Sequence, residues 1–139
     1  MIMGKLAKVR LVGIFCENTG DDPGANLEVY GWLMANTDTA PTWMWQVGDD
    51  DGVNIAEGTL YVINKDVTVH VRDGQNLYIG GELWDDDDIS ADDYMSRPGG
   101  NWAVIPLNEI TPFVKYYEIW FQESDQKIRV DYQVIEEQL

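Results

Sequence analysis

The segment KIRVDYQV, residues 127–134, has the clearest strand pattern of the chain. Apolar and polar side chains alternate along it without interruption. The apolar positions are Ile128, Val130, Tyr132 and Val134, and the polar positions are Lys127, Arg129, Asp131 and Gln133. Successive side chains of a β-strand point to opposite faces, so this pattern predicts a strand with one buried and one solvated face.

The same alternation recurs along the rest of the chain. It is present in residues 67–72, 77–84 and 117–121, and shorter strand-like runs cover residues 8–16, 26–36, 42–47, 58–64 and 102–107. Turn-forming residues at 64–66, 73–74 and 124–126 separate these runs. No window of a dozen residues keeps a helical period. We therefore predict an all-β antiparallel sandwich of eight or nine strands, with residues 1–139 forming a single domain.

The composition restricts the possible partners. The chain has 25 acidic and nine basic residues, for a formal net charge of −16. Such a surface repels nucleic-acid phosphates and strongly anionic lipids, which argues against nucleic-acid binding. The hydrophobic fraction of 45% is that of a folded globule, so the high charge does not indicate disorder.

The single cysteine and the N-terminal segment bear on the compartment. Cys16 lies in the apolar run at residues 11–16, so we predict a small buried side chain, and no intrachain disulfide is possible. The apolar run after the N-terminal basic residues is too short for a signal peptide, and no stretch approaches the length of a membrane span. These features favour a reducing, cytoplasmic compartment.

Residues 85–93 hold six aspartates and are the densest acidic segment of the chain. Calcium is a hard cation that takes six to eight oxygen ligands, which carboxylates at alternating loop positions can supply. Two further acidic loops cover residues 21–28 and 49–52, and loops from different strand pairs of a sandwich can meet at one end. The alternative is that these segments are solvated turns, and for residues 49–51 the two interpretations stand equally.

The spacing does not match an EF-hand loop. Counted from Asp85, the sixth position is Ser90 and the twelfth is Ser96, where an EF-hand has glycine and glutamate. Counted from Asp49, the sixth and twelfth positions are Asn54 and Leu60, which also do not match.

The segment from Trp84 to Met95 resembles the third calcium loop of C2 domains, which are calcium-dependent lipid-binding β-sandwiches. In that family an aromatic strand end is followed by Asp-x-Asp and by a third aspartate six residues later, and this sequence matches that pattern. The resemblance implies that Asp85, Asp87 and Asp93 are calcium ligands. It also places Ile89 at the loop tip, where the family often has a membrane-inserting residue.

A second match is to the family's first calcium loop, which has two acidic ligands six residues apart. Asp22 and Glu28 have this spacing, and the resemblance implies that they are ligands too. The C-terminal hairpin expected at residues 115–136 suits the circularly permuted C2 topology, in which the family's first strand comes last.

These observations favour a calcium-binding, C2-like module that docks onto a lipid or protein surface. Two calcium ions would change the charge from −16 to −12, so we expect a neutral rather than a strongly anionic lipid. One alternative is a structural or assembly sandwich protein. Another is a carbohydrate-binding module with a structural calcium, whose candidate stacking residues are Trp43, Trp45, Tyr116 and Trp120.

We do not expect an enzyme. The only histidine, His70, lies in mid-strand between Val69 and Val71, where a solvent-facing role is the simplest interpretation. The sequence has no nucleophile elbow and no phosphate-binding glycine loop followed by a helix. The sequence indicates no particular oligomeric state.

Overall fold

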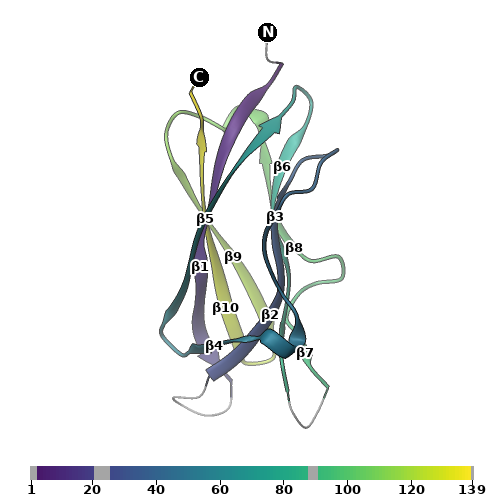
Figure 1. Ribbon diagram of the computed structural model, residues 1–139, viewed down its shortest axis with the longest axis vertical. Helices are drawn as coiled ribbons and strands as arrows, with labels where there is room; N and C mark the ends of the chain where they lie inside the picture. Colours follow the sequence, from purple (N-terminus) through teal and green to yellow (C-terminus); the bar gives the residue numbers. More distant parts are fainter. Residues whose placement is uncertain (1–2, 21–25, 88–90, 139) are drawn as a thin grey trace.

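The computed structural model describes residues 3–20, 26–87 and 91–138 (Figure 1). Within these ranges it contains ten strands and two short 3-10 helices, and no helix there is long and apolar enough to cross a membrane. The elements are β1 (Lys5–Thr19), β2 (Asn26–Asn36), β3 (Trp43–Val47), η1 (Asp49–Asp51), β4 (Val53–Ala56), β5 (Leu60–Val71), β6 (Asn76–Asp85), β7 (Asp93–Tyr94), β8 (Asn101–Pro106), η2 (Leu107–Glu109), β9 (Lys115–Glu123) and β10 (Gln126–Glu136).

Two antiparallel sheets face each other and form a sandwich (Figure 1). One sheet has the order β5-β1-β10-β9, and the other has the order β3-β2-β6-β7 with β4 on β2 and β8 on β6. The first long strand, β1, lies beside the last, β10, and the expected C-terminal hairpin is present as β9–β10. The predicted all-β sandwich is confirmed. The count is ten rather than eight or nine because the short strands β4 and β7 have no extended alternating pattern in the sequence.

The alternation in the sequence corresponds to the two faces of each strand. The apolar positions of β10 are buried in the core between the sheets, as are Leu77, Ile79 and Leu83 of β6. Cys16 is fully buried in β1, as predicted. The Tyr132 hydroxyl, also in the core, donates a hydrogen bond of 3.0 Å to the Met34 carbonyl, so its one polar group is satisfied.

The turn predicted at residues 64–66 is wrong, because β5 continues through it. Asn64 has a φ of 50°, and the pairing of β1 with β5 shifts register between Leu11 and Gly13. This combination is a β-bulge, in which asparagine tolerates the left-handed conformation while the strand goes on. The polar residues therefore mark a bend in a long strand. The turns predicted at 73–74 and 124–126 do separate strands.

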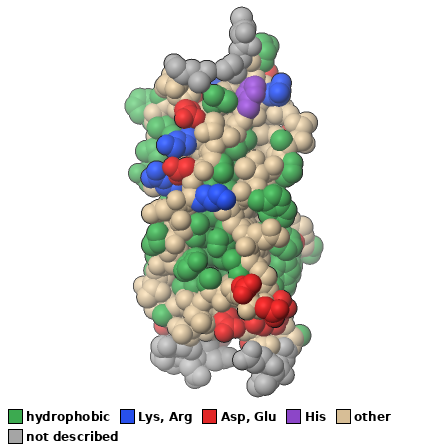
Figure 2. Space-filling view, in the orientation of Figure 1, with side chains coloured by type: hydrophobic (Ala, Val, Ile, Leu, Met, Phe, Trp, Pro, Cys, Tyr) green, Lys and Arg blue, Asp and Glu red, His purple; other side chains and the backbone are tan. Residues whose placement is uncertain are grey.

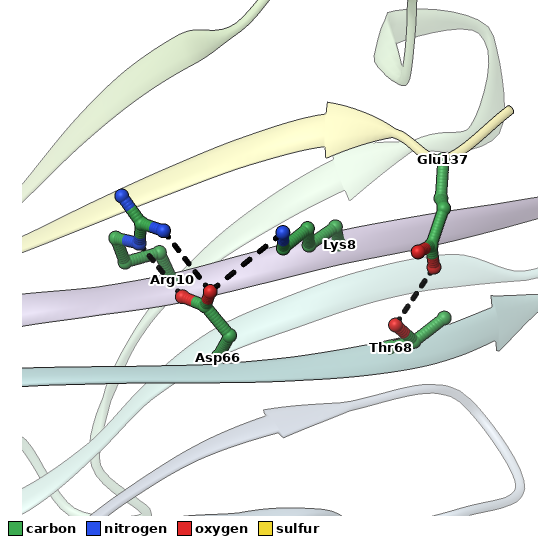
Figure 3. Close-up of polar contacts among 5 residues, drawn as sticks. All are labelled: Lys8, Arg10, Asp66, Thr68 and Glu137. Atoms are coloured by element: carbon green, nitrogen blue, oxygen red, sulfur yellow. Dashed lines mark hydrogen bonds and ion pairs between the residues drawn. The ribbon is translucent and has the colours of Figure 1, made fainter.

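The outer face of β5 and β1 carries polar pairs, which are drawn in Figure 3. Arg10 donates two hydrogen bonds to Asp66, of 2.7 and 3.0 Å, and Lys8 lies 3.7 Å from the same carboxylate. Thr68 donates to Glu137 at 2.8 Å. The Arg10 guanidinium lowers the pKa of Asp66 below its ordinary value. Such exposed pairs contribute little to stability.

Candidate metal centre

Three of the aspartates predicted as ligands lie together at one end of the sandwich. Asp85 ends β6, Asp87 follows it, and Asp93 begins β7. The short β6–β7 ladder pairs Asp93 directly with Asp85, so the hairpin brings the two carboxylates to the same place. One carboxylate oxygen from each of the three residues lies within 4.8 Å of the others. This arrangement offers several hard oxygen donors to a single cation.

Asp85 is the buried member of this cluster, with only 5% of its surface exposed. Its Oδ1 accepts a hydrogen bond of 2.9 Å from the Glu28 backbone N–H, and its Oδ2 accepts one of 2.9 Å from Gln126 Nε2. Burial raises the pKa of Asp85 to about 6, and the carboxylates of Asp87 and Asp93 add to the rise. A cation bound among these groups would relieve both effects, because it stabilises the ionised carboxylate.

Gln126, the first residue of β10, was not among the residues predicted from the sequence. Its Nε2 bonds to Asp85, and its Oε1 is buried with no hydrogen-bond partner in the part of the chain that the structure describes. A buried carbonyl oxygen without a donor costs free energy, whereas a bound cation would satisfy it. The contact joins residues 41 positions apart, so no local motif could have indicated it.

A second hydrogen-bonded group holds the loop that follows β6. Asp92 accepts a hydrogen bond of 3.1 Å from the Asp87 backbone N–H and a short one from the Tyr30 hydroxyl. These donors hold the pKa of Asp92 below its ordinary value, and the pKa of Tyr30 is raised, first by desolvation and then by this bond. Asp92 therefore positions the backbone at Asp87, and its own carboxylate is already engaged.

The other predicted ligands have different outcomes. Glu28 contacts the centre through its backbone, since its N–H donates to Asp85 and its carbonyl accepts from the Asp86 N–H at 2.9 Å. Its side chain is not part of the three-residue cluster found among the described residues. Asp22 and Ile89 lie outside the described residues.

The acidic segment at residues 49–51 forms η1, which lies at the same end of the sandwich as β7 (Figure 1). Figure 2 shows acidic side chains gathered at this end on the visible face, and basic side chains higher up. Desolvation and the bond to Asp92 raise the pKa of Tyr30, and the negative charge of Asp49 in η1 adds to this rise. The expectation that acidic segments meet at one end is consistent with this placement.

Two of the candidate stacking residues, Trp43 and Trp45, pack against different aromatic rings. Trp43 is 49% exposed and packs edge-on against Trp32, with ring centroids 6.4 Å apart. Trp45 is half-buried and packs instead against Tyr61, at 6.5 Å. A register shift between Leu33 and Met34 in the β2–β3 pairing accompanies this difference. The two rings therefore have separate partners.

No protein-family model matches the chain, and no curated protein matches its sequence. Several solved structures do match its fold. The C2 domain designated A in plant extended synaptotagmin 1 is 11% identical, with a TM-score of 0.55, over 99% of this chain and 97% of that one. A structure of the C2 domains A and B of extended synaptotagmin 2 is 15% identical, with a TM-score of 0.52, over 97% of this chain.

A human GIVD cytosolic phospholipase A2, solved with an inhibitor and terbium chloride, matches at 12% identity and a TM-score of 0.53 over 99% of this chain. This chain spans 18% of the phospholipase and 42% of the extended synaptotagmin 2 structure. At these identities the comparison establishes architecture. The chain has a C2-like β-sandwich fold, which confirms at the level of fold the resemblance seen in the Asp-rich loop.

Proposed function

We propose that this chain is a calcium-binding docking module whose centre is Asp85, Asp87 and Asp93. The observation that carries the proposal is the convergence of these three carboxylates within 4.8 Å, beside the buried carbonyl oxygen of Gln126. All four donors are oxygen atoms, the ligand type that calcium prefers. Asp22 and Glu28 remain candidate additional ligands from the resemblance to C2 domains.

The charge balance supports a metal as part of the folded state. Three carboxylates in one place repel each other, and the raised pKa of Asp85 reflects part of that repulsion. A divalent cation offsets the repulsion and can also accept oxygen atoms from a docking partner. We propose that this partner is a surface of neutral, zwitterionic lipid, with Ile89 in contact with it, because the chain stays acidic after metal binding.

The proposal describes a binding module and not an enzyme. The ring nitrogen Nε2 of His70 lies 3.0 Å from the Met3 carbonyl oxygen. This contact with the backbone gives the ring a structural role and needs no catalytic one. We propose that the unit is the whole chain, residues 1–139, acting as one domain in the cytoplasm. The buried, unpaired Cys16 suits a reducing compartment.

Thermal unfolding in EDTA, in millimolar calcium and in millimolar magnesium tests the metal centre. Calcium at about 100 times its Kd should stabilise the protein by about 2.7 kcal/mol, a rise of several degrees in Tm, with a much smaller effect of magnesium. Asp87→Ala should abolish the calcium shift while the circular dichroism spectrum in EDTA stays unchanged. Asp50→Ala, an exposed aspartate of η1, is the matched control and should keep the shift.

Flotation with phosphatidylcholine vesicles tests the docking step separately. The wild-type protein should float with the vesicles in calcium and stay behind in EDTA, and Asp87→Ala should stay behind in both. A calcium shift in Tm without vesicle binding would refute the lipid surface and favour a protein partner. No shift with calcium would refute the metal centre itself, and the acidic loop would then be a solvated turn.

A further inference from the structure

A groove of about 440 Å³ lies on the side of the sandwich, away from the metal centre residues. It runs between β8 and β9, which are edge strands, since within the described ranges β8 pairs only with β6 and β9 only with β10. No hydrogen-bonded ladder therefore closes the space between the two sheets here. The residues that line it include Arg97, Asn101, Trp102, Glu118 and Trp120, with Gly100, Ala103 and Ile119 between them.

The two indole rings of the groove are held in position. Trp120 is 37% exposed, and the Lys127 ammonium lies over its ring, 4.5 Å from the centroid. Trp102 Nε1 donates a hydrogen bond of 2.8 Å to the Gly99 carbonyl. Gly100 has a φ of 97°, and a Cβ there would lie 2.8 Å from Trp102 Nε1, so glycine is needed for this close approach. A ligand would meet rings that are already ordered, which lowers the entropic cost of binding.

The polar side chains of the groove divide into two groups. Asn101 is fully used, because its Oδ1 accepts from the Arg97 N–H and its Nδ2 donates to the Trp120 carbonyl, each at 2.8 Å. The Arg97 carbonyl accepts from the Tyr94 hydroxyl at 2.7 Å, so the backbone at Arg97 is held from both sides. In the described structure neither the Arg97 guanidinium nor the Glu118 carboxylate makes a hydrogen bond or ion pair. Both can therefore form hydrogen bonds with a ligand, although the charge of Glu118 also acts on the Arg129 guanidinium.

We infer that this groove binds a neutral oligosaccharide built from hexoses. The C–H faces of a pyranose ring stack on indole, and its hydroxyls both donate and accept hydrogen bonds, which matches a guanidinium donor beside a carboxylate acceptor. One positive and one negative side chain leave the lining neutral, and the net charge of −16 disfavours an anionic ligand. The volume lies in the range of small-molecule sites, about 300–1,000 Å³.

This site differs from the sugar-stacking set expected from the sequence. Of the four aromatic candidates only Trp120 lines the groove, and the other aromatic residue of its lining is Trp102. The groove shares no residue with the proposed calcium centre, since none of the three clustered aspartates lines it. The two proposals can therefore fail separately.

Isothermal titration calorimetry with soluble malto-, cello-, manno- and N-acetylchito-oligosaccharides, each at millimolar concentration in EDTA, tests the inference. At least one of the four should bind saturably to the wild-type protein. Trp120→Ala should weaken that binding at least about ten-fold and Arg97→Gln by several-fold, because each removes a contact with the sugar. Trp43→Ala, an exposed tryptophan on β3 outside the groove, is the control and should bind like the wild type.

Trp120→Phe keeps an aromatic ring and should retain more affinity than Trp120→Ala, which separates stacking from a general loss of structure. Circular dichroism and Tm of each variant check the fold. Absence of saturable binding for all four sugars would overturn the inference, as would an equal loss of affinity in Trp43→Ala. Repeating the titration in calcium should leave the affinity unchanged if the groove and the metal centre are independent.

Discussion

The side-chain amide of Gln126 donates a hydrogen bond of 2.9 Å to the Oδ2 atom of Asp85 and so connects β10 of one sheet with the end of β6 in the other. Asp85 is buried at this point, and the second atom of the amide, Oε1, is buried beside it without a partner among the described residues. The candidate metal centre is therefore a junction between the two sheets, built from both. This junction explains how a C-terminal hairpin residue takes part in a site whose carboxylates all come from residues 85–93.

Replacing Gln126 should weaken calcium binding. Gln126→Leu removes both the hydrogen bond to Asp85 and the carbonyl oxygen next to the carboxylates, so we expect calcium affinity to fall about ten-fold, or about 1.4 kcal/mol. Calcium titration followed by tryptophan fluorescence measures the change. Gln122→Leu, on the exposed face of β9, should leave the affinity unchanged. Equal affinities of Gln126→Leu and wild type would show that the amide contributes nothing to the centre.

The metal-free protein should lose stability as the pH rises from about 4 to about 6. The pKa of Asp85 is about 6 in the folded state and 3.8 ordinarily, so between these values the folded state binds more protons than the unfolded state. Protonated Asp85 stabilises the folded state fully below about pH 4, the pKa in the unfolded chain. This contribution, about 2–3 kcal/mol of unfolding free energy, is lost as the pH rises through about 6, the pKa in the folded state.

Urea unfolding in EDTA at a series of pH values measures this change, with Asp85→Asn as the comparison because it cannot ionise. The unfolding free energy of the wild type relative to that of Asp85→Asn should fall as the pH rises across that range. A constant difference would contradict the raised pKa. Other carboxylates titrate in both proteins and therefore cancel in the comparison.

Truncation in the core should cost far more than truncation on an exposed edge. Ile128→Ala in β10 removes a fully buried side chain between the sheets, and we expect a loss of about 2–5 kcal/mol in unfolding free energy. Val104→Ala in β8, which is exposed, should change it by less than about 0.5 kcal/mol. Urea denaturation with unchanged m-values measures both, and a small effect of Ile128→Ala would argue against the described packing.

The thiol of Cys16 should be unreactive in the native protein. Burial raises its pKa to about 11, so at pH 8 only about one molecule in a thousand carries the reactive thiolate, and the side chain is also inaccessible. Ellman's reagent should react with Cys16 only after denaturation. Val62→Cys introduces a thiol at a position that is 58% exposed and should react promptly in the folded protein. Rapid reaction of the wild-type protein would mean that β1 opens readily.

The fold could be predicted from the sequence because alternation is a local property. Wherever the period of two ran for several residues, as in β10 and β6, the buried face was predicted correctly, since each strand must turn one face to the core. The error at Asn64 has a local cause too. An asparagine in a left-handed conformation suits a turn and a bulge equally, and only the pairing with β1 distinguishes them.

The carboxylate cluster could be predicted in part. The density of aspartates at residues 85–93 indicated a metal site, and the resemblance to C2 domains implied Asp85, Asp87 and Asp93 in particular, which the structure brings together in the hairpin of β6 and β7. The amino-acid composition and the spacing of residues also indicated the acidic surface, the buried cysteine and the absence of an EF-hand loop. These are properties of composition and spacing, and they need no knowledge of which strands pair.

Only the tertiary structure decided what surrounds these residues. The Gln126 amide reaches Asp85 because β10 and β6 belong to facing sheets. Trp102 and Trp120 line one groove because their edge strands, β8 and β9, lie along the same side of the sandwich. Trp43 and Trp45, which are two positions apart in the sequence, pack against different rings, and a register shift in the β2–β3 pairing accompanies this difference. Contacts across a sandwich depend on sheet order and register, which distant segments determine jointly.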